Sequence, residues 1–294
     1  MNLSINTGCT SPFYATPENL KQIRKAGFDC FDFSFFTPDI EARLRGEDYL
    51  EIADETLDAA EAAGISCNQA HAPFTFRFGC EMNESEPRYR ALVRSIALAA
   101  KLGARCIVVH SVMTPACVSL PDYNLQYFRS LIPYCEKANI RIGFENIFDY
   151  DRTHRCLGRF STPEQINGFL DRLNHPLFTA CVDTGHAAIG GTEPEALIRG
   201  LGGERLTALH IQDTDYLDDR HLPPFLGLQH WDAIADALRE IGYCGDLTLE
   251  IPKFFSHMDP SVVPAALTFA AETGRCLIRK IETGASAPSS GSCI

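Results

Sequence analysis

The fold is decided at residues 177–183, LFTACVD, an apolar run that ends in a carboxylate. Three further runs have the same form: IRIGFEN at 140–146, LTALHIQD at 206–213 and DLTLEI at 246–251. Strands that are apolar on both faces are typical of a covered parallel sheet, where a carboxylate is costly unless it has a partner. The four runs place an acidic or imidazole side chain at or near their C-terminal ends: Glu145, Asp183, His210 and Glu250. Four such side chains converging from successive strands predict a divalent-metal site.

The alternation of an apolar β-type run with a helical segment occurs eight times along the chain. The other four strands are expected at 3–8, 28–35, 65–71 and 104–110. Eight βα units in 294 residues, without a linker or a break in composition, predict an α/β fold with one domain, the (β/α)8 TIM barrel. We expect the barrel to occupy residues 1–282 and a small, polar, flexible tail to occupy residues 283–294.

Helix boundary signals agree with this division. Thr16 and Pro17 are a candidate N-cap and first helical residue, and Gly27 is a candidate stop for that helix. The segments RYRALVRSIALAAKLG at 88–103 and STPEQINGFLDRL at 161–173 have helical spacing or the same Ser/Thr-Pro-Glu opening. Helices are therefore expected between the strands.

Composition is that of a globular enzyme, with 45% hydrophobic and 22% charged residues. No segment approaches the roughly 18 consecutive apolar residues of a membrane span, and the first residues lack the features of a signal peptide. We therefore expect a cytoplasmic protein with no membrane partner. The net charge of −12 argues against a large nucleic-acid surface.

The 12 cysteines include no C-x-x-C pair. Several lie inside expected strands, where cysteine is a small buried hydrophobe: Cys30, Cys67, Cys106 and Cys181. Free thiols are expected rather than disulfides.

The working face of a TIM barrel is formed by the C-terminal ends of its strands. His71, His110 and His186 lie at or just beyond such ends, and Asp219 and His221 follow the seventh strand. A single histidine there is more often structural, and the segment around Asp219 alone would be a charged, solvated loop. Three histidines around a carboxylate cluster favour a functional site.

At these residues the chain resembles the xylose-isomerase-like barrels. This superfamily includes sugar-phosphate isomerases and epimerases, ketose 3-epimerases and the type IV apurinic endonucleases. The resemblance covers about residues 3–282. It rests on F-E-N at 144–146, V-D-T-G-H at 182–186, L-H-I-Q-D at 209–213, L-E-I at 249–251 and D-R-H-L-P-P at 219–224.

The resemblance implies that Glu145, Asp183, His210 and Glu250 hold one divalent ion, which would be Mn, Mg, Co or Zn. Three carboxylates and one imidazole also suit a hard or borderline cation that keeps open coordination positions. In the ketose epimerases the positions of Glu145 and Glu250 flank the reacting carbon. One would remove a proton next to a carbonyl to give a metal-stabilised enediolate, and the other would return a proton. The expected activity is therefore that of a metal-dependent sugar, or sugar-derivative, isomerase or epimerase.

The remaining site residues are expected to bind the carbohydrate substrate: His71, His110, His186, Asp219 and His221. Ketose 3-epimerases also carry a glutamate six residues after the first metal ligand and an arginine six residues after the metal histidine. Asp151 and Tyr216 occupy those places, so the resemblance leaves the sugar unspecified. Lyase or hydratase chemistry on oxidised glycosides is an alternative that uses the same enolising groups.

Type IV apurinic endonucleases supply an alternative from another class. They bind three zinc ions with nine ligands, and the nine residues named above are of the right type at every matching place. The candidate loops of the working face, however, mix basic residues with at least as many acidic ones, which is unfavourable for DNA binding. A barrel that binds a sugar or partner without catalysis is a third alternative. A homo-oligomer is expected from the resemblance only.

Overall fold

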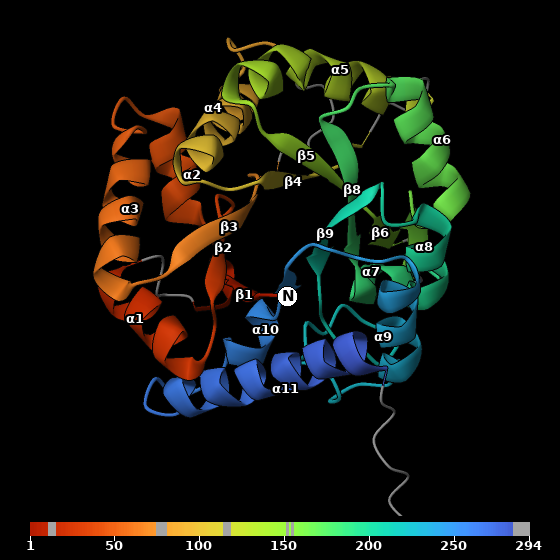
Figure 1. The fold of residues 1–294 in the computed structure, drawn as a ribbon. Helices are drawn as coiled ribbons and strands as arrows, with labels where there is room; N and C mark the ends of the chain where they lie inside the picture. The colour runs from red at the N-terminus through yellow and green to blue at the C-terminus, as the bar shows by residue number, and fades with distance from the viewer. Residues whose placement is uncertain (11–15, 75–80, 114–118, 151–152, 154–155, 285–294) are drawn as a thin grey trace, which may run out of the picture.

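The computed structural model describes residues 1–10, 16–74, 81–113, 119–150, 153 and 156–284. Eight parallel strands form one sheet in the order β10-β1-β2-β3-β4-β5-β8-β9. A parallel bridge between Ile211 and Leu249 joins its two edges, so the sheet forms the expected barrel (Figure 1). The barrel strands are β1 (Leu3–Asn6), β2 (Cys30–Ser34), β3 (Ser66–His71), β4 (Cys106–His110), β5 (Arg141–Glu145), β8 (Phe178–Asp183), β9 (Leu206–His210) and β10 (Leu247–Leu249).

Helices surround the barrel (Figure 1). Eight of them pack their apolar faces against the outside of the sheet, and the last of these, α11, follows the final strand: α1 (Pro17–Ala26), α3 (Glu51–Ala63), α4 (Pro87–Lys101), α5 (Leu120–Ala138), α6 (Pro163–Leu173), α8 (Pro194–Leu201), α9 (Trp231–Glu240) and α11 (Val263–Thr283). Other helical segments belong to the loops that follow the strands: η1 (Thr7–Thr10), α2 (Pro38–Arg45), α7 (Thr184–Ile189) and α10 (Pro252–Phe255). The (β/α)8 prediction is confirmed.

The expected helix signals act as capping interactions. The Thr16 side chain accepts a hydrogen bond from the Asn19 N–H, and Gly27 ends α1 in the left-handed conformation at φ +114°. Helix α6 begins with a capping box in which Thr162 and Gln165 satisfy each other's backbone N–H groups. These local interactions fix where the helices begin and end.

Two features differ from the sequence expectations. Several strands are shorter than expected; the seventh ends at His210 rather than at Asp213 because its apolar run continues into the next loop. A small antiparallel hairpin, β6 (Ile147–Tyr150) and β7 (Cys156–Arg159), follows β5 and was not anticipated. Each hairpin strand has four residues, which is too short for a periodicity signal.

Four small side chains of the barrel strands form a hydrophobic cluster separate from the main core: Cys106, Val108, Cys181 and Ala208. The described cysteines are free thiols, and Cys30 and Cys67 are likewise buried in strands, as expected. Helix α11 ends at Thr283, so residues 285–294 of the predicted tail lie outside the described residues. Among the described helices, none combines the length and apolar character that crossing a bilayer requires.

Candidate metal centre and active site

The four predicted metal ligands meet at the C-terminal mouth of the barrel. Glu145, Asp183 and His210 are the last residues of β5, β8 and β9, and Glu250 follows β10 directly. All four side chains are buried. One ligand atom from each lies within 4.8 Å of those of the other three, so the cluster is compact enough to hold one ion.

His210 is central to this cluster. Its Nδ1 lies 2.7 Å from Oε1 of Glu145 and 3.4 Å from Oε2 of Glu250. The strands that carry the two glutamates are separated by β8 and β9 in the sheet. The two carboxylates therefore approach the same point from different sides of the mouth.

A carboxylate that the sequence analysis did not single out orients His210. Asp32 of β2 lies with Oδ2 3.1 Å from Nε2 of His210, and it also accepts a hydrogen bond of 2.9 Å from Gln69. This contact favours a proton on Nε2 of His210, so that Nδ1, which faces the two glutamates, is the ring nitrogen available to an ion. The available signal was Asp32 itself, one of two aspartates in the phenylalanine-rich run 28–35.

The structure shows what Asp183 and Gly185 of the V-D-T-G-H motif contribute. Asp183 caps α7 by accepting a hydrogen bond of 2.6 Å from the His186 N–H. The Asn146 side chain accepts a hydrogen bond of 2.8 Å from the Asp183 N–H and donates one of 2.9 Å to the Asp183 carbonyl oxygen. A Cβ on Gly185 would lie 2.4 Å from Cδ of Gln212, so this position needs glycine. Gln212 in turn donates to Asp183 at 3.1 Å.

Glu145 also belongs to a second group, with two of the expected substrate-binding histidines. Nε2 of His110 lies 2.5 Å from Oε2 of Glu145, and Nε2 of His71 lies 3.5 Å from the same oxygen. The two histidine nitrogens are 3.2 Å apart. These three residues can also hold an ion, so Glu145 could bridge two cations.

The other three expected substrate-binding residues form a third group. Nε2 of His221 lies 2.9 Å from Oδ2 of Asp219, and Nε2 of His186 lies 3.7 Å from Oδ1 of the same side chain. Nζ of Lys253 lies 3.0 Å from Asp219 Oδ2. The structure thus gathers all nine predicted site residues at the mouth, in three groups.

Electrostatics within the cluster favour positive charge. Burial raises the pKa of Glu145, but the neighbouring His210 and His110 outweigh it and hold that pKa well below its ordinary value. Burial lowers the pKa of His221, but the hydrogen bond and charge of Asp219 reverse this and raise it to about 9. Burial raises the pKa of Asp183 to about 6, because the opposing charges of His186 and His221 only partly offset it.

The donor set fits a divalent cation. Among the described residues, the ion pairs of Glu145, Asp183 and Glu250 are all with histidine and none is with lysine or arginine. Buried carboxylates without a cationic partner are costly. Three carboxylates and one imidazole form the mixed oxygen and nitrogen set that Mn, Mg, Co or Zn accepts while keeping positions open.

Comparison with known proteins agrees with the architecture. The family model of the xylose isomerase-like TIM barrel matches residues 20–269. The chain belongs to this family. A relative from Sinorhizobium fredii, the uncharacterized protein y4fM, is 27% identical over 258 residues, which is 80% of each chain.

Two solved structures share the fold over nearly the whole length of both chains. A D-tagatose 3-epimerase-like protein has a TM-score of 0.75 at 19% identity, with 97% of this chain and 100% of that chain covered. The IOLI protein, solved with a binding zinc atom, has a TM-score of 0.70 at 17% identity, with 98% and 100% covered. At these identities the likeness establishes the fold alone.

Two aromatic side chains at the mouth of this family member were also missed by the sequence analysis. Phe36 and Phe74 stack with ring centroids 4.7 Å apart, and Phe36 lies edge-on to His71 at 4.9 Å. Phe74 is 38% exposed. An apolar ring face beside polar groups is typical of small-molecule sites. Each follows a predicted strand closely, which was the only signal available.

The structure describes one of the two positions at which this chain departs from the ketose 3-epimerases. Asp151 lies outside the described residues. Tyr216 is described: its hydroxyl donates a 3.0 Å hydrogen bond to Glu193, and its backbone is left-handed at φ +65°. The tyrosine is therefore held by a glutamate and supplies no cationic group at this place.

Proposed function

We propose that the protein is a divalent-metal-dependent isomerase or epimerase of a small sugar or sugar derivative. One observation carries the proposal: Glu145 and Glu250 approach a single buried ligand cluster from different sides of the mouth, and both contact Nδ1 of His210. Two carboxylates so placed can act on opposite faces of one carbon atom. The enzyme neighbours of known structure are consistent with this chemistry.

Glu145, Asp183, His210 and Glu250 would hold the ion. When bound, it would polarise the substrate carbonyl and acidify the adjacent C–H. One glutamate then accepts the carbon-bound proton, which leaves an enediolate, and the other, already protonated, returns a proton to the opposite face. The two carboxyl groups exchange protonation states in each turnover.

The other polar residues would bind and orient the sugar. His186 would donate a hydrogen bond to the substrate oxygen on which charge develops. His71, His110 and His221 would bind hydroxyl groups, and the Phe36–Phe74 wall would pack against the apolar face of the sugar. Because these groups are fixed by their own hydrogen bonds, the site is ordered before the substrate arrives.

The test combines metal content with proton exchange. Protein purified without added metal is analysed for elements, then incubated in heavy water with a panel of ketoses and inososes. About one Mn, Co, Mg or Zn per chain, with deuterium entering beside the carbonyl, is the expected result. Loss of water or of a glycosidic group from an oxidised glycoside would instead indicate a lyase or hydratase. Metal-loaded protein with no exchange on any substrate would overturn the proposal.

A second candidate, a trinuclear zinc phosphodiesterase, is favoured by one specific observation. Three of the overlapping groups with ligand spacing together contain all nine residues, and Glu145 belongs to two of these three. Close to three zinc ions per chain, with cleavage of a duplex that contains an abasic site and no proton exchange, would select this candidate. The net charge of −12 argues against it.

A further inference from the structure

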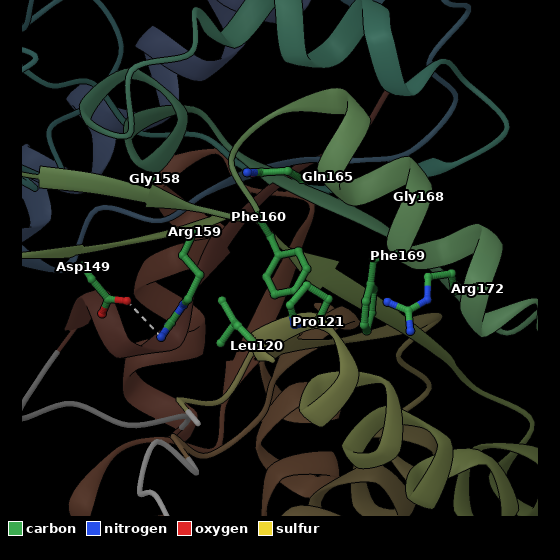
Figure 2. A pocket seen from close by; sticks show the side chains of 10 residues that line it. All are labelled: Leu120, Pro121, Asp149, Gly158, Arg159, Phe160, Gln165, Gly168, Phe169 and Arg172. Carbon is green, nitrogen blue, oxygen red and sulfur yellow. Dashed lines mark ion pairs between the residues drawn. The ribbon is translucent and has the colours of Figure 1, made fainter. Parts of the chain in front are cut away.

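A cavity lies beside the barrel, next to the β6–β7 hairpin (Figure 2). Its volume is about 480 Å³, within the range of small-molecule sites. The hairpin, the start of α5 and one face of α6 form its walls. Its apolar surface comes from Leu120, Pro121, Phe160 and Phe169.

The hairpin separates this cavity from the catalytic mouth. On one side of β6, the Phe148 ring lies 5.2 Å from the His186 ring, whereas the next residue, Asp149, lines the cavity. Strand β7 packs directly on the end of α7, since a Cβ on Gly158 would lie 2.6 Å from the Gly190 carbonyl oxygen. The cavity is therefore distinct from the metal cluster and is not an extension of it.

Arg159 gives the cavity a cationic end. Its side chain is 6% exposed, and its Nη1 contacts Asp149 at 3.0 Å and also the sulfur of Met113. Nε is buried and has no hydrogen-bond partner among the described residues. An unsatisfied buried donor is energetically costly. Burial also lowers the pKa of Arg159, although Asp149 opposes the effect.

The charged residues of the lining are two arginines and one aspartate, in a protein whose net charge is −12. Figure 2 shows Arg159 and Arg172 at opposite ends, with the aromatic and aliphatic side chains between them. Arg172 already pairs with Asp122 at 2.5 Å. Arg172 is half exposed, whereas Arg159 is buried and its Nε has hydrogen-bonding capacity left for a ligand.

We propose that this cavity binds a small carboxylate with an aromatic or aliphatic body. The apolar walls would cover the body of the ligand, and the carboxylate would take the unused donor capacity of Arg159. This site is independent of the proposed reaction, because none of its lining residues belongs to the metal cluster.

The test uses benzoate as the probe and benzamide as its neutral counterpart, with dissociation constants measured by calorimetry or ligand-observed NMR. Gly168 of α6 lines the cavity, and a Cβ there meets nothing within 4 Å. Gly168→Leu fills the cavity and replaces glycine with a better helix former. Glu164→Leu, on the same helix but outside the lining, is the matched control.

Wild type and Glu164→Leu should bind benzoate alike, whereas Gly168→Leu should weaken binding by at least about tenfold. Benzamide should bind at least about tenfold more weakly than benzoate. Unchanged metal content and circular dichroism in Gly168→Leu would show that its barrel is intact. Absence of benzoate binding to wild type, equal affinity in Gly168→Leu, or equal affinity for benzamide would each overturn the proposal.

Discussion

The buried carboxylates at the two ends of the barrel have different kinds of partner. At the N-terminal end, Asp246 accepts hydrogen bonds of 3.0 Å from Asn2 and from Asn68 and forms an ion pair with Arg105. At the C-terminal mouth, the carboxylates of Glu145, Asp183 and Glu250 have imidazole partners. The carboxylate of Asp246 is satisfied by its amide and guanidinium partners, whereas the carboxylates at the mouth could hold a cation.

The difference separates stability from function within one fold. Amide hydrogen bonds and the charge of one guanidinium group satisfy Asp246, so it serves as a structural carboxylate. Imidazoles exchange protons near neutral pH and accept metals. A TIM barrel is expected to keep its chemistry at the C-terminal ends of the strands, and the distribution of charge partners in this molecule has that polarity.

The largest expected effect follows from removing a carboxylate at the mouth. Glu145→Gln should reduce proton exchange by about 10²- to 10⁴-fold, because it removes both a proposed base and a ligand. Glu250→Gln should behave similarly. Exchange rates in heavy water measure the loss, and circular dichroism checks the fold. Glu136→Gln, on the outer surface of α5, is the control; activity near wild type in Glu145→Gln would contradict the assignment.

The corresponding change at the other end should affect stability instead. Asp246→Asn removes charged hydrogen bonds to Arg105 and Asn68 and should lower the free energy of unfolding by about 2 kcal/mol. Urea denaturation of the metal-free protein measures the change. Metal affinity should stay the same, because Asp246 lies at the far end of the barrel; a large loss of affinity would remove the distinction between the two ends.

A third substitution tests whether Asp32 orients His210 at the mouth. Asp32→Asn should weaken metal binding by about 10- to 100-fold, since the amide no longer fixes the tautomer of His210 as strongly. Competition with a chelator measures the affinity. Long-range nitrogen–proton NMR of His210 should show that the Nε2-protonated tautomer is less populated. Unchanged affinity together with an unchanged tautomer would assign Asp32 a packing role only.

The smallest effect is expected at an ordinary surface ion pair. Burial raises the pKa of Asp29, but hydrogen bonds from Arg275 and the Leu3 N–H outweigh it and lower that pKa. Asp29→Asn should therefore cost at most about 1 kcal/mol at pH 7. Because the folded pKa is depressed, this stability is fully present above the unfolded pKa of about 4. It is lost as pH falls through the folded pKa.

Urea denaturation of wild type and Asp29→Asn at several pH values checks this dependence. The two unfolding free energies should converge in acid. A difference that stayed constant down to the lowest pH would mean that the ion pair with Arg275 is not its cause.

The strand pattern predicted the architecture because each βα unit carries its own local signals. LFTACVD and IRIGFEN lie within the observed strands or directly beside them, and Thr16 and Thr162 cap the helices as expected. The β6–β7 hairpin was missed because its conformation depends on packing against α7 rather than on periodicity.

The candidate site was predictable in its members but not in its contacts. The C-terminal ends of parallel strands meet at one end of a barrel, so the residue types at those ends indicate the site from the sequence. The roles assigned to these residues remain predictions. Asp32 could not be paired with His210 from sequence, since 178 residues separate them.

By itself, the sequence determined the barrel and the set of side chains that its mouth carries, because hydrophobic periodicity and capping act over short distances. The tertiary structure alone decided how those side chains divide into three groups, which nitrogen of His210 faces the carboxylates, and that Arg159 lies buried beside an apolar cavity. These outcomes depend on distances between residues far apart in the chain. Only the packing of the complete barrel sets those distances.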